Sequence, residues 1–312
     1  MPSHDVLRLD GQVAVVTGAG GNPSLGRCYA RLLAARGASV VVNDIGAAVS
    51  GGRGCSASSD AVAVAAEICA DGGTAVADTT SIATADGAAA IVATAIETFG
   101  RLDILVNNAG VCLWAGLAEM SEADIEEHIA VNLMGTIWMC RAAWPTMRDQ
   151  RYGRIVNVTS GSAFGLMPGT SVYGAAKGGV LAFTKAVAAE MQPYGVRCNA
   201  VSPVARTGMV ASAAWPDSPM FGASPPDLVA PGVLLLSHRD CPVNGEVLRC
   251  VDGAFGRVTI SQSTRVSSGG GDAVAEALLA RSDDLFGDVG LAPLAIAPVS
   301  LLEELRLKPY VP

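Results

Sequence analysis

Short apolar runs rich in β-branched residues recur along the chain and alternate with longer, alanine-rich segments. The apolar runs are continuous, as is typical of strands buried on both faces of a parallel sheet, and occupy residues 13–16, 40–42, 104–106, 155–158 and 196–201. The alanine-rich segments carry apolar residues at helical spacing and occupy residues 24–36, 60–71, 84–99, 121–148 and 173–192. The alternation predicts a single α/β domain over residues 1–266, with a Rossmann-like, doubly wound parallel sheet of seven strands flanked by helices.

Three segments interrupt this alternation. Residues 45–59 are rich in Gly, Ser and Ala and predict an insertion after the second strand. Residues 202–226 contain five prolines. They follow a strand at the edge of the sheet where ligands bind, so we expect a mobile substrate lid there. The run Ser-Ser-Gly-Gly-Gly at 267–271 predicts a linker, and we expect residues 267–312 to form a C-terminal extension too small to fold alone.

Composition narrows the range of partners. The chain has 29 acidic and 21 basic side chains, a net charge of −8, and no basic stripe, which argues against nucleic acid as a partner. Its eight cysteines form no C-x-x-C pair and its three histidines form no cluster, so we expect neither a disulfide framework nor a metal site. The N-terminus does not resemble a signal peptide and no apolar stretch is long enough to span a bilayer; we expect a cytoplasmic protein with no membrane partner.

A glycine-rich turn follows the first strand and leads into a helix. Glycines there allow the backbone to approach a pyrophosphate, and the helix N-terminus supplies N–H donors. The candidate cofactor contacts in this turn are Gly18, Gly20, Asn22, Ser24, Leu25 and Gly26. Asp44, at the end of the second strand, can accept hydrogen bonds from a ribose diol and repel a 2′-phosphate, which favours NAD over NADP. After the fourth strand, the small residues of Asn108-Ala109-Gly110 leave room for a flat ring.

Ser160, Tyr173 and Lys177 form the pattern that points most directly to chemistry. Tyr173 and Lys177 are four residues apart, so a helix places both on one face. We expect the ammonium to lower the pKa of the phenol, so that it can exchange a proton near neutral pH. Ser160, at the end of the fifth strand, can donate a hydrogen bond to a substrate oxygen.

Over about residues 10–260 these motifs resemble the short-chain dehydrogenase/reductase family. The matching residues are Thr17-Gly18, Asp44, Asn107-Asn108-Ala109-Gly110, Asn132, Ser160, Tyr173, Lys177, Asn199 and Pro203. The resemblance implies that Tyr173 transfers the hydroxyl proton, Lys177 also binds the nicotinamide ribose and Ser160 orients the oxygen. It further implies that Asn132 holds a water that connects the lysine to solvent.

The same resemblance implies further cofactor contacts. It places either Asp78 or Thr80 at the adenine and leaves open which of the two makes the contact. It places Pro203 and Val204 beside the nicotinamide, where the family usually has Pro-Gly. The cofactor loop is two residues longer than usual, with a Gly18-to-Ser24 spacing like that of enoyl-acyl-carrier-protein reductases. Those enzymes space Tyr and Lys by seven, and because position 180 is Val, enoyl reduction is disfavoured.

Within the family, residues 41–44, 141–144, 152–155 and 227–231 resemble the dehydrogenase domain of peroxisomal multifunctional enzyme type 2 and its bacterial relatives. The likeness implies NAD-dependent oxidation of a secondary alcohol on a bulky apolar substrate, such as a 3-hydroxyacyl-CoA or a hydroxysteroid, by a homodimer or homotetramer. Two alternatives stay open: a dehydrogenase for smaller secondary alcohols, and a non-catalytic NAD-binding partner subunit.

The expected substrate region is apolar and has few cations. Arg206 is the only cation of the predicted lid and Arg53 lies in the earlier insertion, so contacts for the phosphates of CoA are scarce. The bulky apolar residues expected around the pocket are Trp114, Phe164, Leu166, Met167, Met209, Trp215, Met220 and Phe221.

Overall fold

The computed structural model describes residues 6–46, 60–207 and 224–262, together with Leu278, Ala280 and residues 292–293. The predicted lid is therefore described only at its two ends. Most of the predicted insertion at 45–59 and of the predicted C-terminal extension lies outside the described residues, as do Arg53, Met209, Trp215, Met220 and Phe221.

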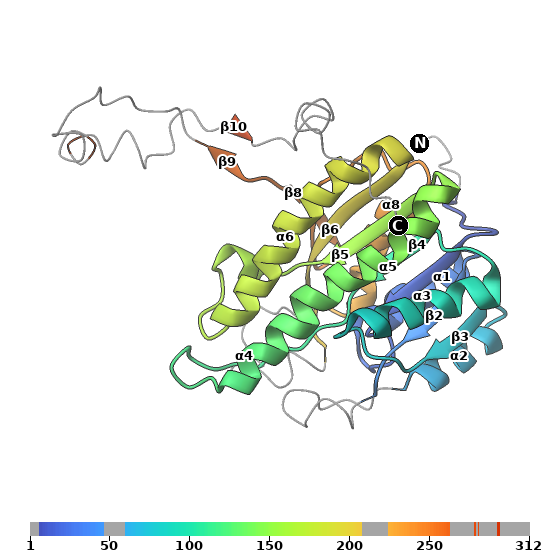
Figure 1. Ribbon diagram of the computed structural model, residues 1–312, viewed down its shortest axis with the longest axis horizontal. Helices are drawn as coiled ribbons and strands as arrows, with labels where there is room; N and C mark the ends of the chain where they lie inside the picture. Colours follow the sequence, from blue (N-terminus) through green and yellow to red (C-terminus); the bar gives the residue numbers. More distant parts are fainter. Residues whose placement is uncertain are drawn as a thin grey trace.

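The described chain is built on one twisted sheet of strand order β3-β2-β1-β4-β5-β6-β7-β8 (Figure 1). The strands are β1 (Val13–Thr17), β2 (Ser39–Asn43), β3 (Thr74–Asp78), β4 (Ile104–Asn107), β5 (Gly153–Val158), β6 (Val196–Val204), β7 (Val247–Val251) and β8 (Ala254–Val258). The first seven pair in parallel. The predicted doubly wound, Rossmann-like α/β fold is confirmed.

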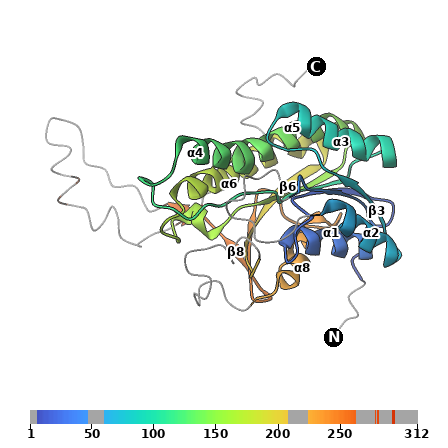
Figure 2. The same cartoon turned by 90° about the horizontal axis from the view of Figure 1, so that it is seen from below.

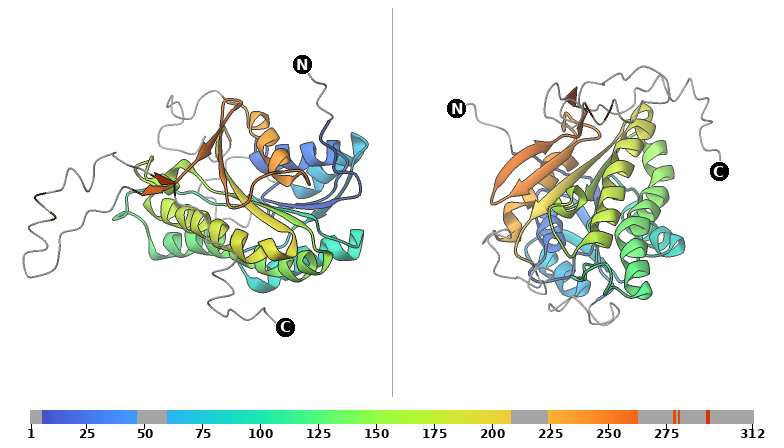
Figure 3. Two further views of the ribbon diagram at one scale, coloured as in Figure 1. Left: turned by 90° about the horizontal axis from the view of Figure 1, so that it is seen from above. Right: turned by 90° about the vertical axis from the view of Figure 1, so that its left-hand side faces the viewer.

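The predicted count of seven strands was wrong, because an eighth strand pairs antiparallel with β7 at the edge of the sheet (Figure 3). Asp252 and Gly253 join the two strands and both have positive φ, 50° and 73°, as in the tight turns that favour hairpins. β8 is almost entirely exposed and therefore lacks the continuous apolar run by which the other strands can be recognised.

Helices cover both faces of the sheet (Figure 2). One face packs against α1 (Leu25–Ala35), α2 (Ala61–Ala70) and α8 (Ala230–Ser237). The other face packs against α3 (Ala85–Phe99), α5 (Gly135–Gln150) and α6 (Ser171–Met191). Strands β1 and β4 are buried at every position, which explains why their sequences are apolar throughout.

Shorter elements complete the described chain. They are α4 (Glu122–Ile129), the π-helical η1 (Ala130–Met134), the 3-10 helices η2 (Gly161–Phe164), η3 (Gln192–Tyr194) and η5 (Pro226–Leu228), and the paired strands β9 (Ser261–Gln262) and β10 (Ala292–Pro293). The predicted helix over 121–148 is thus α4 and α5 with a π-helical stretch between them. No helix within the described ranges is long and apolar enough to cross a membrane.

A buried chain of polar side chains joins the middle of the sheet to α6. Asn107 Nδ2 on β4 donates to Asn157 Oδ1 on β5, at 2.8 Å, and Asn157 Nδ2 donates to Thr184 Oγ1 on α6, at 2.9 Å. The network fixes α6 relative to the carboxyl ends of β4 and β5. The sheet reverses its winding between β1 and β4, so a ligand site is expected outside their carboxyl ends.

Candidate active site

A cavity of about 710 Å³ opens at this carboxyl edge of the sheet. Twelve of the residues predicted from the sequence line it: Gly18, Ser24, Leu25, Asp44, Asn108, Ala109, Gly110, Ser160, Tyr173, Lys177, Pro203 and Val204. Six do not: Gly20, Asn22, Gly26, Asp78, Thr80 and Asn132. The structure therefore brings Ser160, Tyr173 and Lys177 together with the glycine-rich turn and Asp44.

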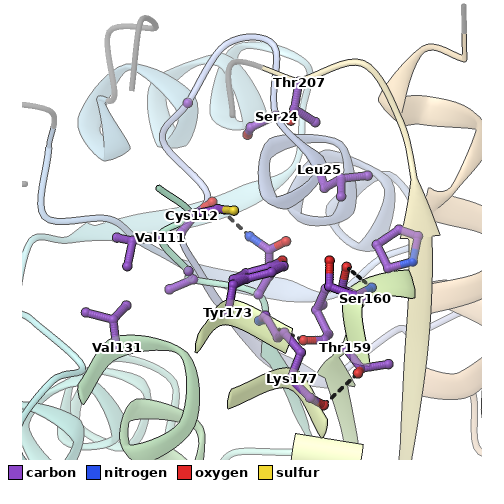
Figure 4. A pocket seen from close by; sticks show the side chains of 18 of the residues that line it. Ser24, Leu25, Val111, Cys112, Val131, Thr159, Ser160, Tyr173, Lys177 and Thr207 are labelled. Carbon is purple, nitrogen blue, oxygen red and sulfur yellow. Dashed lines mark hydrogen bonds between the residues drawn. The ribbon is translucent and has the colours of Figure 1, made fainter. Parts of the chain in front are cut away.

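Tyr173 and Lys177 project from the first turns of α6 toward Ser160, which follows β5 (Figure 4). The ammonium Nζ of Lys177 lies 5.7 Å from the centroid of the Tyr173 ring. It donates to the carbonyl oxygen of Val158 at 2.9 Å, and Thr159 Oγ1 donates to the carbonyl oxygen of Lys177 at 2.8 Å. The end of β5 therefore holds the lysine on both its side chain and its backbone.

Burial dominates the ionisation of this pair. It raises the pKa of Tyr173 well above its usual value, the nearby Cys112 acts in the same direction, and a hydrogen bond with Ser160 opposes both. Burial lowers the pKa of Lys177 to about 8. The sequence-based expectation of a phenol acidified by its lysine is therefore not met, because both groups are removed from water and each favours its neutral form.

Besides its hydrogen bond with Tyr173, the side chain of Ser160 stabilises the local fold. Its Oγ accepts from the N–H of Ser162 at 3.2 Å and so caps the 3-10 helix η2. An oxygen that accepts one backbone hydrogen bond still has its own proton to donate. Ser160 can therefore donate toward an oxygen bound next to Tyr173.

Asn132 supports the site from behind the cavity wall. It is fully buried in the π-helical stretch, a feature frequent at functional sites. Its Oδ1 accepts from the N–H of Val111 at 3.2 Å, and its Nδ2 donates to the carbonyl oxygens of Val111 and His128 at 2.9 and 3.0 Å. A Cβ at Gly110 would lie 2.6 Å from Asn132 Oδ1, so this approach requires glycine. The side chain of Asn132 thus positions the segment after β4.

His128, which the sequence analysis did not select, holds the next part of that segment. Its Nε2 accepts from the N–H of Leu113 at 3.0 Å and its Nδ1 bonds the carbonyl oxygen of Asp124 at 2.6 Å. An accepting Nε2 and a donating Nδ1 assign the neutral tautomer. Asn132 and His128 are four residues apart, so their helical spacing is the sequence signal that could have linked them.

The glycine-rich turn is shaped by close approaches that only glycine permits. Gly18 has a φ of +64°, and a Cβ there would lie 2.6 Å from the Cα of Ala109. A Cβ on Gly26 would overlap the carbonyl oxygen of Gly18 and come within 2.5 Å of Asn108 Nδ2. Asn108 Nδ2 in turn donates to the carbonyl oxygens of Thr17 and Gly18, at 2.9 and 3.0 Å. The turn is thereby held open against the N-terminus of α1, and this cradle fits a pyrophosphate.

Asp44 lines the same cavity. Its carboxylate accepts from the N–H of Gly20 at 2.9 Å and from the N–H of Gly46 at 3.0 Å. It therefore ties the end of β2 to the glycine-rich turn and leaves lone pairs on both oxygens for a ribose diol.

The carboxylate of Asp78 forms hydrogen bonds within the fold. Its carboxylate accepts from the N–H of Thr80, from Asn43 Nδ2 and from Thr94 Oγ1, at 2.8, 3.0 and 2.7 Å. It joins β2, β3 and α3, and neither Asp78 nor Thr80 reaches the cavity. The residues that line this part of the cavity are Ser81, Ile82 and Ala83.

Cys112 and Arg249 are among the other lining residues that the sequence analysis did not select. Cys112 is 6% exposed and interacts electrostatically with Tyr173 and Lys177; burial raises the pKa of its thiol to about 12. Arg249, on β7, lines the cavity behind Gly161. Of the expected apolar residues, Trp114, Leu166 and Met167 line the cavity, whereas Phe164 packs against Leu181 and Val247. Within the described ranges, no group of three or more His, Cys, Asp or Glu is placed to hold a metal.

Comparison with known proteins agrees with this arrangement. A family model described as short chain dehydrogenase matches residues 12–216. The chain is 39% identical over 253 residues to peroxisomal multifunctional enzyme type 2 of Mus musculus, a match that covers 81% of this chain and 33% of the relative. It is 41% identical over 249 residues to a putative short-chain type dehydrogenase/reductase of Mycobacterium tuberculosis, which covers 80% of this chain and 85% of that one.

Solved structures agree as well. The crystal structure of a short chain dehydrogenase from Mycobacterium avium is 37% identical, has a TM-score of 0.75 and covers 92% of this chain and 98% of that chain. The chain spans only a third or less of the mouse and fungal multifunctional relatives. The chain belongs to the short-chain dehydrogenase/reductase family, whose members bind a nicotinamide cofactor.

Proposed function

We propose that the protein is an NAD-dependent dehydrogenase that interconverts a secondary alcohol and a ketone on a bulky, largely apolar substrate of the hydroxyacyl-CoA or hydroxysteroid type. The observation that carries the proposal is the convergence of Ser160, Tyr173 and Lys177 in one cavity with the glycine cradle and Asp44. The mouse relative is named a peroxisomal multifunctional enzyme type 2, and its match with this chain extends over 253 residues.

The chain's own groups divide the reaction between them. The nicotinamide group supplies the acceptor for the hydride that leaves the carbinol carbon. Tyr173 takes the hydroxyl proton during oxidation and returns it during reduction, while Ser160 donates a hydrogen bond to the oxygen on which negative charge develops. Lys177 places a positive charge beside the phenol when it is protonated.

The raised pKa of Tyr173 favours ketone reduction over alcohol oxidation at neutral pH. Because burial raises the pKa of Tyr173, the phenol is protonated and is ready to donate to a carbonyl oxygen. Oxidation needs the phenolate, so we expect kcat/KM for alcohol oxidation to increase as pH increases from 7 to 10. The rate of ketone reduction is expected to fall over the same range. An oxidation rate that decreases with rising pH would contradict this role for the phenol.

Removal of the phenol hydroxyl tests the acid/base assignment. Tyr173→Phe is expected to lower turnover by at least about 100-fold, with the dissociation constant for NAD nearly unchanged. The assays are cofactor reduction with a panel of hydroxyacyl-CoAs, hydroxysteroids and simple secondary alcohols, and calorimetric titration of NAD. Tyr152→Phe, which removes another half-buried phenol hydroxyl, is the matched control.

The same panel separates the alternative functions. Full activity of Tyr173→Phe would refute the assignment. NAD binding without turnover of any substrate by the unaltered protein would favour the non-catalytic subunit. Turnover of small alcohols alone would favour the dehydrogenase for smaller substrates.

The preference for NAD is proposed to depend on Asp44. A carboxylate that faces a ribose repels a 2′-phosphate, so Asp44→Ser is expected to weaken NAD binding and to improve NADP binding. We expect the ratio of the dissociation constants for NAD and NADP to change by at least about tenfold, which corresponds to the loss of one charge-assisted hydrogen bond. Asp71→Asn, which removes an exposed carboxylate paired with Arg31, should leave the ratio unchanged.

We also propose a homodimer or homotetramer, which the family resemblance favours. α5 carries the half-buried Trp138 and Trp144, and apolar side chains of this kind are typical of interfaces. Light scattering at micromolar concentration would show the oligomer, and a monomeric mass would refute it.

A further inference from the structure

Arg249 is a charged residue at a strand position where the fold otherwise places apolar side chains. Side chains alternate between the two faces of β7, so Arg249 shares a face with Val247. Val247 packs against Leu181 of α6 and Ala200 of β6, which identifies this face as the one that looks toward α6 and the cavity. A guanidinium placed there loses hydration and needs compensating partners.

The immediate contacts of Arg249 bring it next to the catalytic serine. In the register of the sheet it lies opposite Ser202 of β6, and its Nη1 donates to Ser202 Oγ at 3.3 Å. A Cβ on Gly161 would lie 3.2 Å from Nη1 and 3.9 Å from Nη2. The guanidinium therefore lies against the residue that directly follows Ser160, and Arg249 and Gly161 both line the cavity.

Arg249 is half-buried and has no carboxylate partner among the described residues. Other arginines of the described ranges are paired with acids, among them Arg8, Arg27, Arg31, Arg101, Arg148 and Arg257. The buried Arg154 instead donates to four backbone carbonyl oxygens. Arg249 has five N–H donors, and its one hydrogen bond to a described residue goes to the neutral hydroxyl of Ser202.

The acids that line the cavity do not neutralise it. Asp44 and Glu127 are the acidic residues among the described cavity lining, and neither forms an ion pair with Arg249. The carboxylate of Asp44 is engaged by the backbone N–H groups of Gly20 and Gly46. Within the part of the chain that the structure describes, no carboxylate pairs with this guanidinium, which lies at the edge of the reaction site.

We propose that Arg249 binds a carboxylate of the substrate, so that the preferred substrates are hydroxy acids or keto acids whose carboxylate is a few bonds from the reacting carbon. The inference rests on the proposed dehydrogenase chemistry, and it differs from the proposal above in the substrate class, because a free acid takes the place of the CoA ester or steroid. Its geometric basis is that the guanidinium adjoins Gly161, the residue after Ser160, which in the proposed function donates to the reacting oxygen. The phosphates of a CoA ester are many bonds from its carbinol carbon, so they are poorly matched to this position. A planar guanidinium matches the geometry of a carboxylate.

The test compares matched acid and neutral substrates. We would measure kcat/KM for NAD reduction with medium-chain 3-hydroxy acids and with their methyl esters. The protein is expected to prefer the acid, and Arg249→Gln is expected to reduce kcat/KM for the acid by about 10- to 100-fold, the usual effect of losing a charge-assisted hydrogen bond. The same substitution should leave kcat/KM for the ester within about twofold.

Two further variants separate substrate binding from a structural role. Ser202→Ala removes the neutral partner but keeps the cation, so the preference for the acid should persist. Arg257→Gln removes an exposed cation on β8 that is paired with Glu246, and it should change kcat/KM for neither the acid nor the ester. Equal losses for acid and ester in Arg249→Gln, or loss of the acid preference in Ser202→Ala, would overturn the proposal.

Binding measurements distinguish failure of this inference from failure of the proposed function. Octanoate should raise the thermal unfolding midpoint of the NAD-saturated protein, and Arg249→Gln should abolish that shift, whether or not the protein turns over any alcohol. No shift with the unaltered protein would overturn the inference alone. An NAD dissociation constant that weakens tenfold in Arg249→Gln would instead assign the guanidinium to the cofactor and refute a substrate role.

Discussion

Lys177 provides a quantitative test of how strongly this site is removed from water. Its side chain is 2% exposed, and burial lowers the pKa of the ammonium from 10.5 to about 8. Each pKa unit corresponds to about 1.4 kcal/mol, so the protonated lysine costs the folded protein about 3 kcal/mol. We therefore expect Lys177→Met to increase the free energy of unfolding at pH 7, although it removes a catalytic group.

The pH dependence of this effect has a definite sign. Because the folded-state pKa is lower than the unfolded-state value, the cost is fully present below about pH 8. It fades as pH rises from about 8 to 10.5 and is absent above that range. The substitution also leaves the carbonyl oxygen of Val158 without its donor, and this reduces the gain in the free energy of unfolding by about 1 kcal/mol at every pH. The stability gain of Lys177→Met should therefore be greatest at pH 7 and should shrink by pH 10.

The assay is urea unfolding of both proteins at pH 7, 8, 9 and 10 in the presence of a reducing agent. Subtraction of the two free energies at each pH cancels the ionisation of the buried cysteines and of Tyr173. Lys185→Met is the matched control, because it removes a lysine on the same helix whose Nζ donates to the carbonyl oxygen of Gly245. A difference that stays constant from pH 7 to 10, or that grows with pH, would refute the desolvation argument.

Other features of the site give further predictions. Gly26→Ala forces a Cβ onto the carbonyl oxygen of Gly18. We expect it to weaken NAD binding at least tenfold in a calorimetric titration, because overpacking against backbone costs about 1–3 kcal/mol. Gly178→Ala, with space for a Cβ on α6, should instead raise the free energy of unfolding by about 0.5–1 kcal/mol, and a loss there would contradict the packing argument. Thr184→Val removes the acceptor of buried Asn157 Nδ2, so urea unfolding should show a loss of about 1–3 kcal/mol; no loss would mean that the polar chain does not hold α6.

The sequence was sufficient for the parallel part of the fold because burial on both faces makes a strand apolar throughout. It was insufficient for β8, because an exposed edge strand carries no such pattern, and the Asp252-Gly253 turn was the signal that could have revealed it. The helix expected over 121–148 is present as the contiguous run α4, η1 and α5. Its π-helical stretch was not predicted.

For the site residues, too, the sequence was sufficient where local spacing determines a position and insufficient where contacts between distant segments do. Ser160, Tyr173 and Lys177 could be identified because short spacings and strand ends determine where they lie. The hydrogen-bond partners of Asp78 come from β2 and α3, and no spacing along the chain shows that they occupy its carboxylate. The position of the Arg249 side chain opposite Ser202 depends on the register between β6 and β7, which is set by pairing between residues far apart in sequence.

The segment after β4 has a consequence for how substrates are recognised. Val111 and Leu113 are hydrogen-bonded to the side chains of Asn132 and His128, and both of those residues are buried. This wall of the cavity is thus preorganised, and the entropy loss of ordering it accompanies folding rather than each binding event. Engineering of substrate preference should accordingly succeed more readily by exchanging Cys112, whose side chain protrudes from the rigid wall, than by inserting or deleting residues in its backbone.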